Sequence, residues 1–124
     1  MSLKLQIEVV DRKEDARGAL LKLWPAPVGG EVYAVQLRPG FPRGRHYHRR
    51  GAEHFIALVG RPVLVVEDPA TGQRQVVVLD GVRVTVPAGL AHAFFATDHD
   101  ALVLAIAELR PDQDETVPWP VAPP

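Results

Sequence analysis

The sequence contains no cysteine, so disulfide bridges and thiolate metal ligands are both excluded, and any bound metal must be held by nitrogen and oxygen atoms. It also lacks an apolar run approaching the ~18 residues of a membrane-spanning helix, and residues 1–18 lack the hydrophobic core of a signal peptide. Neither sign of charge dominates, and the formal net charge of -1 gives no reason to expect nucleic acid or a membrane surface as a partner. These absences together predict a cytoplasmic protein.

Long stretches with helical periodicity are missing too, and short strands take their place. The 124 residues are enough for one core, and 47% hydrophobic with 23% charged residues is ordinary for a globular protein, so we expect a single domain over residues 1–124. Short alternating runs bounded by proline and glycine are typical of an all-β sandwich or barrel. The predicted strands span residues 4–10, 19–24, 31–37, 52–59, 62–67, 73–79, 82–86, 91–96 and 101–108.

Two segments do not fit the alternating pattern. Residues 11–17 are almost all charged and predict a loop that ends at Gly18. The tail, about residues 110–124, contains five of the twelve prolines. Because proline cannot donate a hydrogen bond to a neighbouring strand, we expect this tail to run over the surface or across a partner subunit rather than inside a sheet.

Four side chains with nitrogen or oxygen ligand atoms stand at spacings that bring them together. Successive side chains of a strand point to opposite faces, so His46 and His48 face the same way. The loop 49–52 is short enough to fold the next strand back antiparallel, which places Glu53 beside the pair, and His92 on a second hairpin closes the group. Three imidazoles and one carboxylate suit one divalent transition metal such as Zn, Fe, Ni, Mn or Cu.

The same residues resemble the two motifs of the cupin superfamily. The first motif, G-x5-H-x-H-x4-E-x6-G, is matched from Gly40 to Gly60, and the second, G-x5-P-x-G-x2-H-x3-N, from Gly81 to Ala96. Nine of the ten fixed positions agree, and only the final asparagine, which the family does not use as a ligand, is replaced by Ala96. The resemblance implies an all-β fold, the small double-stranded β-helix of the cupin jelly-roll barrel, with a metal at its four ligands.

Shorter motifs are similar to those of cupins that act on nucleotide sugars. An Asp-x-Arg-Gly element contains Arg17, and Arg43 begins an Arg-Gly-x-His-Tyr element. The segment 87–94 is similar to the Pro-x-Gly-x-Ala-His-x-Phe of the dTDP-4-dehydrorhamnose 3,5-epimerases, and sugar-reductase cupin domains and dTDP-sugar ketoisomerases share parts of this pattern. The resemblance implies that Arg17 and Arg43 hold the diphosphate of a nucleotide sugar whose sugar is a 4-keto-6-deoxyhexose.

Two departures from the 3,5-epimerase pattern argue against that particular reaction. In those enzymes the histidine that matches His46 is a general base and no metal is needed, whereas here His48 replaces the usual glutamine and completes a ligand pair. The acid tyrosine of those enzymes is also missing from residues 101–108. Tyr33 is a weak candidate acid, and the sequence does not identify the base.

The residues around the ligands allow more than one interpretation. Arg43 and the other arginines near the histidines form either a solvated basic rim or an anion site that binds phosphate or carboxylate through paired hydrogen bonds. Phe94 shares the face of the third histidine and either lines the pocket or is a core aromatic. His54 is expected on the opposite face of its strand and His99 in a polar turn, so we expect neither to bind the ion.

Three functions are compatible with this set of residues. The first is a metal-dependent isomerase or epimerase that acts on a small anionic or sugar ligand, such as a nucleotide keto sugar, by polarising a carbonyl so that the adjacent proton becomes acidic. The second is a non-haem metal dioxygenase, which the same ligands would serve. The third is a non-catalytic module that binds a sugar or small metabolite. We also expect a homodimer, because the strand edges of a small jelly roll need cover.

Overall fold

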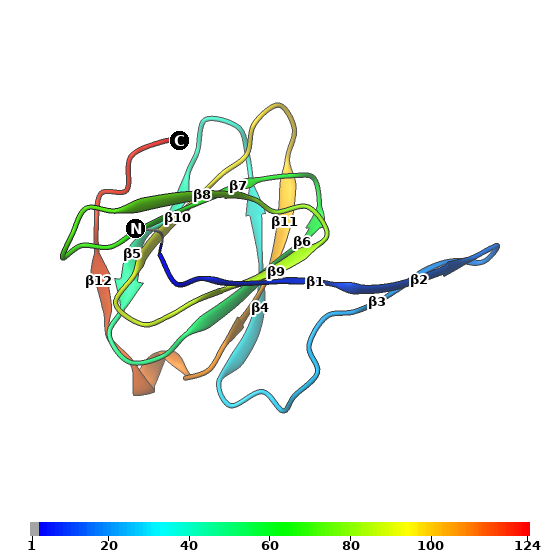
Figure 1. Ribbon diagram of the computed structural model, residues 1–124, viewed down its shortest axis with the longest axis horizontal. Coiled ribbons are helices and arrows are strands. Elements are labelled where there is room, and N and C mark those ends of the chain that lie inside the picture. Colours follow the sequence, from blue (N-terminus) through cyan, green and yellow to red (C-terminus); the bar gives the residue numbers. More distant parts are fainter. Residues whose placement is uncertain (1–2) are drawn as a thin grey trace.

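Antiparallel strands, the loops between them and one short 3-10 helix make up the computed structural model, which describes residues 3–124 (Figure 1). Two five-stranded sheets pack face to face. The first sheet has the order β1-β9-β6-β11-β4, formed by Gln6–Val9, Val82–Val86, Glu53–Val59, Ala101–Ala107 and Glu31–Leu37. The second has the order β12-β5-β10-β7-β8, formed by Thr116–Pro118, Arg43–His48, Ala91–Phe95, Val63–Glu67 and Arg74–Val78. This is the jelly-roll barrel that the sequence predicts.

The core lies between the two sheets and follows from the alternation of each strand. On β6, Glu53, Phe55 and Ala57 point inward while His54 and Ile56 point outward. Phe55, Leu64, Val84 and Val103 from four different strands meet in this interior, and each is at most 1% exposed. A polar residue at an inward position is therefore surrounded by apolar side chains. Because Glu53 occupies one of these inward positions on β6, its carboxylate lies inside the barrel.

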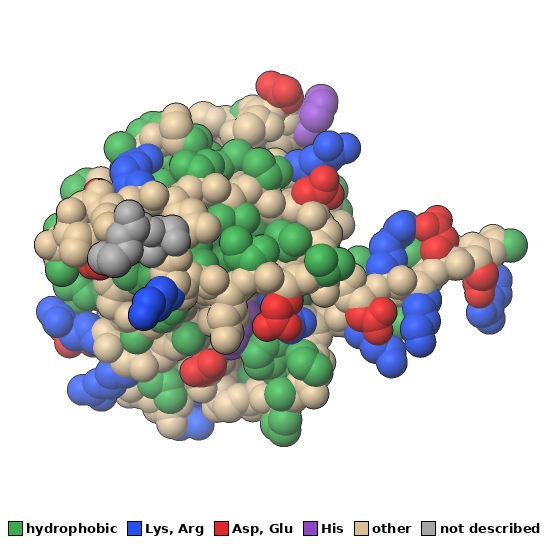
Figure 2. Space-filling view, in the orientation of Figure 1, with side chains coloured by type: hydrophobic (Ala, Val, Ile, Leu, Met, Phe, Trp, Pro, Cys, Tyr) green, Lys and Arg blue, Asp and Glu red, His purple; other side chains and the backbone are tan. Residues whose placement is uncertain are grey.

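A two-stranded arm, β2 (Asp11–Asp15) and β3 (Gly18–Lys22), stands away from the barrel (Figure 1). Every residue of both strands is exposed, and charged side chains of both signs gather along the arm (Figure 2). The predicted loop at residues 11–17 is therefore wrong for its first five residues. A ribbon that buries neither face needs no apolar alternation, so its strand character comes from pairing across the turn between Asp15 and Gly18.

The proline-rich tail begins with a short 3-10 helix, η1 (Pro111–Gln113), and then joins a sheet. Its strand β12 pairs antiparallel with β5, an edge strand that the sequence did not predict. Further on, Trp119 and Val121 pack on the outer face of the second sheet. The tail thus covers the strand that carries the histidine pair. Nowhere in residues 3–124 does a helix have the length and apolar character required to span a bilayer.

Candidate metal centre

A local distortion of β5 brings the histidine pair close to β10. Gly44 and Arg45 both have positive φ angles, +87° and +58°, and the register between β5 and β10 shifts at this point. A Cβ atom on Gly44 would lie 2.9 Å from the carbonyl oxygen of His92, so only glycine allows the two backbones to approach this closely. As a result, His46 lies directly opposite His92 in the sheet.

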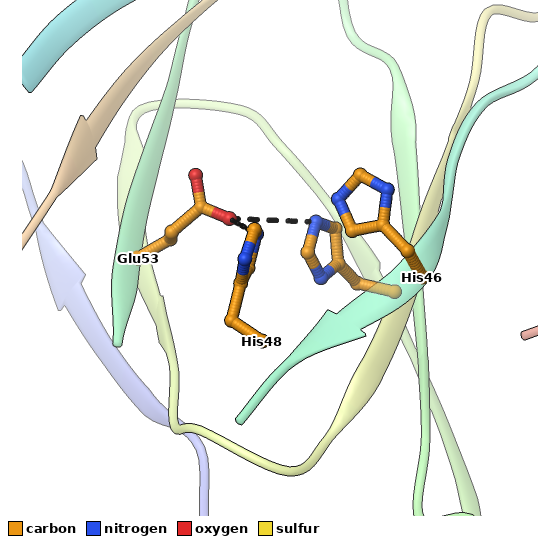
Figure 3. A group of neighbouring side chains, drawn as sticks. His46, His48 and Glu53 are labelled. Carbon is orange, nitrogen blue, oxygen red and sulfur yellow. Dashed lines mark ion pairs between the residues drawn. The ribbon is translucent and has the colours of Figure 1, made fainter. Parts of the chain in front are cut away.

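The four side chains expected to bind a metal converge inside the barrel. His46, His48, Glu53 and His92 each offer one ligand atom, and these atoms all lie within 4.8 Å of one another. Figure 3 shows Glu53 from β6 directed toward the imidazoles that β5 supplies. His48 Nε2 forms an ion pair with Glu53 Oε1, and His92 Nε2 lies 3.9 Å from the same oxygen. The ring centroids of His46 and His92 are 4.9 Å apart.

The buried atoms of this cluster lack the hydrogen bonds that buried polar atoms normally have. Glu53 and His92 are 4% and 2% exposed, respectively. His92 Nδ1 has no hydrogen-bond partner, and His48 Nε2 and Glu53 Oε1 have none apart from their ion pair with each other, although such buried groups in proteins are almost always bonded. Three imidazoles and a carboxylate that face one another with unused lone pairs fit a divalent transition ion.

Neighbouring side chains hold the cluster in place. The hydroxyl of Tyr33, on β4, donates a hydrogen bond of 2.5 Å to Glu53 Oε2. On the other side, Thr116 Oγ1 of β12 lies 3.1 Å from His48 Nδ1. The ring of Phe55 packs against His92, with centroids 5.1 Å apart. Each of these three contacts restricts the orientation of one candidate ligand.

Burial and contacts within the cluster shift the pKa values of His46, His92 and Glu53 in directions that favour ligation, and that of His48 in the opposite direction. Burial lowers the pKa of His92 to about 3 and also lowers that of His46, so both imidazoles stay neutral near pH 7. Burial alone would raise the pKa of Glu53, but its contacts with the histidines and Tyr33 outweigh burial and lower it. The contact with Glu53 raises the pKa of His48. A carboxylate and neutral imidazoles are the protonation states that bind metals.

A cavity of about 220 Å³ opens over the cluster, between β4, β5 and the segment that follows β11. Three of the candidate ligands line it, together with Tyr33 and Leu109. Its rim is acidic: Glu31 and Asp114 contribute to the lining, and the one arginine there, Arg110, is hydrogen-bonded to Asp112 at 3.1 Å. The cavity thus gives a small ligand access to the carboxylate and the histidine pair.

Of the candidate residues that are not metal ligands, only Tyr33 lines this cavity. Tyr33 is in its wall, whereas Phe94 lies beneath the cluster in the core, with its ring 5.7 Å from that of His92. Arg43 lines a separate pocket with Gln36, Arg38 and Phe41. Arg17 is at the exposed turn of the arm, where it pairs with Asp15 at 2.7 Å, and it does not line the cavity.

Two histidines lie outside the cluster, as the sequence predicts. His54 is on the outer face of β6, where it contacts Thr85 at 2.7 Å and Glu108 at 3.1 Å and packs on Trp24. His99 is exposed in the turn before β11. No pattern in the sequence indicates Thr116, because nothing near it suggests a strand and its partner is 68 residues away.

Comparison with known proteins gives one family match and several solved structures with the same fold. The family model described as polysaccharide biosynthesis C-terminal domain matches residues 13–112. No curated protein sequence matches the chain.

Solved structures with this fold include an isomerase, an epimerase and a ketoisomerase. A dTDP sugar isomerase from Desulfovibrio desulfuricans G20 superposes with a TM-score of 0.84 at 21% identity, over 94% of this chain and 84% of its own. A 3'-monoepimerase from Streptomyces bikiniensis in complex with dTDP-quinovose has a TM-score of 0.80 at 22% identity, over 94% and 72%. A 3,4-ketoisomerase from Helicobacter canadensis has a TM-score of 0.75 at 20% identity, over 91% and 90%. At these identities the likeness establishes the shared fold.

Proposed function

The chain belongs to the polysaccharide biosynthesis C-terminal domain family, and from this premise we propose that it is a metal-dependent cupin that isomerises or epimerises a nucleotide-linked keto sugar. The observation that carries the proposal is the convergence of three imidazoles and a carboxylate beneath a cavity of about 220 Å³. Proteins of the same fold are a dTDP sugar isomerase, a 3'-monoepimerase and a 3,4-ketoisomerase, which supports a sugar substrate.

In this proposal His46, His48, Glu53 and His92 hold one divalent ion. When bound, such an ion supplies Lewis-acid polarisation of a substrate carbonyl oxygen. The surrounding apolar residues, Phe55 and Phe94 among the buried ones, exclude water from the far side of the cluster and leave the cavity as the route of access. The substrate carbonyl must therefore enter from the side of Tyr33.

The cavity is large enough for a sugar ring but smaller than the ~300–1,000 Å³ that enclose a drug-sized ligand, so the nucleotide part must lie outside it. The pocket that contains Arg38 and Arg43 lies close to the cavity in sequence, because Gln36 is three residues after Tyr33 on β4 and Arg43 is three residues before His46 on β5. We propose that Arg43, with Arg38, binds the anionic part. The position of Arg17 on the arm places it outside this pocket.

Tyr33 is the proposed acid, and its replacement by phenylalanine gives a direct test. Burial, together with the nearby Glu53 carboxylate, raises the pKa of Tyr33, so its hydroxyl stays protonated at the cavity wall, and it would turn from Glu53 to protonate a substrate oxygen. General acid catalysis contributes about 10²–10⁴-fold, so we expect Tyr33→Phe to lower the turnover rate by at least roughly 100-fold. Because Tyr33 also holds Glu53, the variant is assayed with the metal in excess so that the site stays occupied.

Tyr47→Phe is the matched control, because Tyr47 is on β5 but packs outward against Trp119. Its rate should equal that of the unmodified protein. An unchanged rate in Tyr33→Phe, with metal retained, would remove Tyr33 from the proposed chemistry.

The reaction itself is tested by solvent exchange. Incubation of the metal-loaded protein with dTDP- or UDP-linked 4-keto-6-deoxyhexoses in deuterated water should incorporate deuterium at a carbon next to the ketone, as mass spectrometry would show. Protein with Glu53→Gln should incorporate none. Absence of exchange across several such sugars would refute isomerase or epimerase activity and leave a binding role.

A further inference from the structure

The tail beyond the family match reaches into the candidate metal centre. The match ends at residue 112, and the residues that follow form hydrogen bonds with the loop between β5 and β6. The carboxylate of Asp114 accepts hydrogen bonds from the backbone nitrogens of Arg50 and Gly51, each at 2.9 Å. The backbone nitrogen of Arg49 donates to the carbonyl of Glu115 at 3.0 Å. These bonds fix the start of β12 beside β5.

The register of β12 then places one hydroxyl beside one imidazole. Thr116 is the direct partner of His48 in the antiparallel pairing, and its Oγ1 lies 3.1 Å from His48 Nδ1. The other ring nitrogen, Nε2, is turned toward Glu53 in the interior. When His48 is neutral and its Nδ1–H donates to Thr116, the lone pair of the ring is on Nε2, the atom that faces the cluster and that a bound ion would take in place of the proton shared with Glu53.

We propose that Thr116 is a positioning residue of the metal centre, which fixes the tautomer and ring orientation of His48 so that Nε2 can bind a divalent ion. This inference rests on the proposed function, since it concerns the same four ligands. Ligating histidines are generally held through their second ring nitrogen, and loss of such a partner typically costs 10–100-fold in metal affinity. The tail therefore orients a candidate ligand, in addition to covering the edge of β5.

Zinc affinity, measured by competition with a chromogenic chelator at pH 7.5, tests the role of Thr116. Thr116→Val keeps the shape of the side chain and removes the hydroxyl, so we expect zinc to bind about 10–100-fold more weakly. Thr116→Ser keeps the hydroxyl and should bind like the unmodified protein. Thr85→Val is the matched control, because Thr85 contacts Nδ1 of His54 at 2.7 Å on the outer face, and its zinc affinity should not change.

A second measurement follows the imidazole itself. In the zinc-loaded protein at pH 8, the ¹⁵N shifts of His48 should report a protonated Nδ1 and a metal-bound Nε2, and Thr116→Val should change the Nδ1 shift because its hydrogen bond to the hydroxyl is lost. Equal zinc affinity in Thr116→Val and the unmodified protein would overturn the inference while leaving the metal site intact. So would weak binding by Thr116→Ser, or unchanged ¹⁵N shifts in Thr116→Val. Absence of zinc binding by the unmodified protein would instead refute the proposed function.

Discussion

Glu53→Gln is expected to lower the affinity of the protein for zinc by more than roughly 100-fold, the upper end of what the loss of an indirect partner costs. Glu53 is the only anionic member of the cluster, it is 4% exposed, and its Oε1 faces both His48 and His92. An amide has nearly the same shape but no negative charge, so the variant should fold and lose the ion. Titration with zinc in the presence of a competing chelator measures the change.

Glu108→Gln provides the matched control for this substitution. Glu108 also contacts a histidine, His54 at 3.1 Å, but on the outer face of the first sheet. Its zinc affinity should equal that of the unmodified protein. Equal affinities in Glu53→Gln and Glu108→Gln would mean that the carboxylate inside the barrel is not a ligand.

The second large effect is on stability, where Phe55→Ala should reduce the free energy of unfolding by about 3–5 kcal/mol. Phe55 is 1% exposed, and its ring lies 4.8 Å from that of Phe94 and 5.1 Å from that of His92. Its removal would leave a cavity beneath a candidate ligand as well as a gap in the core. Urea denaturation of the metal-free protein, followed by circular dichroism, gives the free energy directly.

Phe41→Ala is the control for Phe55→Ala, because Phe41 is 73% exposed. Its effect on unfolding should stay within about 0.5 kcal/mol. A loss below about 1.5 kcal/mol for Phe55→Ala, well under the range for buried aromatics, would contradict the packing described for the barrel interior.

Much of the fold could be predicted because most strands bury one face. Residues 31–37 and 82–86 were predicted as strands and form β4 and β9 with the same bounds. Residues 11–15 were missed as a strand because the arm lies against neither sheet, so no apolar period marks it. The sequence does predict β3, at residues 19–24, whereas β2 is a strand only through its pairing with β3, and pairing of an exposed, charged segment has no signal in a single sequence.

The candidate site could be predicted in part for a similar reason. His46 and His48 share a face by alternation alone, and the short loop that follows them fixes the position of Glu53. Thr116 could not be found, because its approach to His48 depends on the path of a proline-rich tail. The pocket of Arg38 and Arg43 could be found only from the structure, because it brings together residues of β4, of β5 and of the turn between them.

The arm is the feature that bears on assembly. Its Leu20 and Leu21 are 56% and 43% exposed, although both are large apolar residues. A two-stranded ribbon is marginally stable by itself, which supports the homodimer predicted from the need to cover strand edges. The homodimer stays a prediction, as does the cytoplasmic location.

The most direct test of the metal centre is the metal content of the freshly purified protein. Elemental analysis should find one divalent transition metal per chain in the unmodified protein and none in His48→Ala. Zinc would favour the isomerase over an oxygenase, and iron would reverse that preference. An unmodified protein that contains no metal, and takes up none when zinc, iron, nickel, manganese or copper is supplied, would contradict the proposal that these four side chains form a metal site.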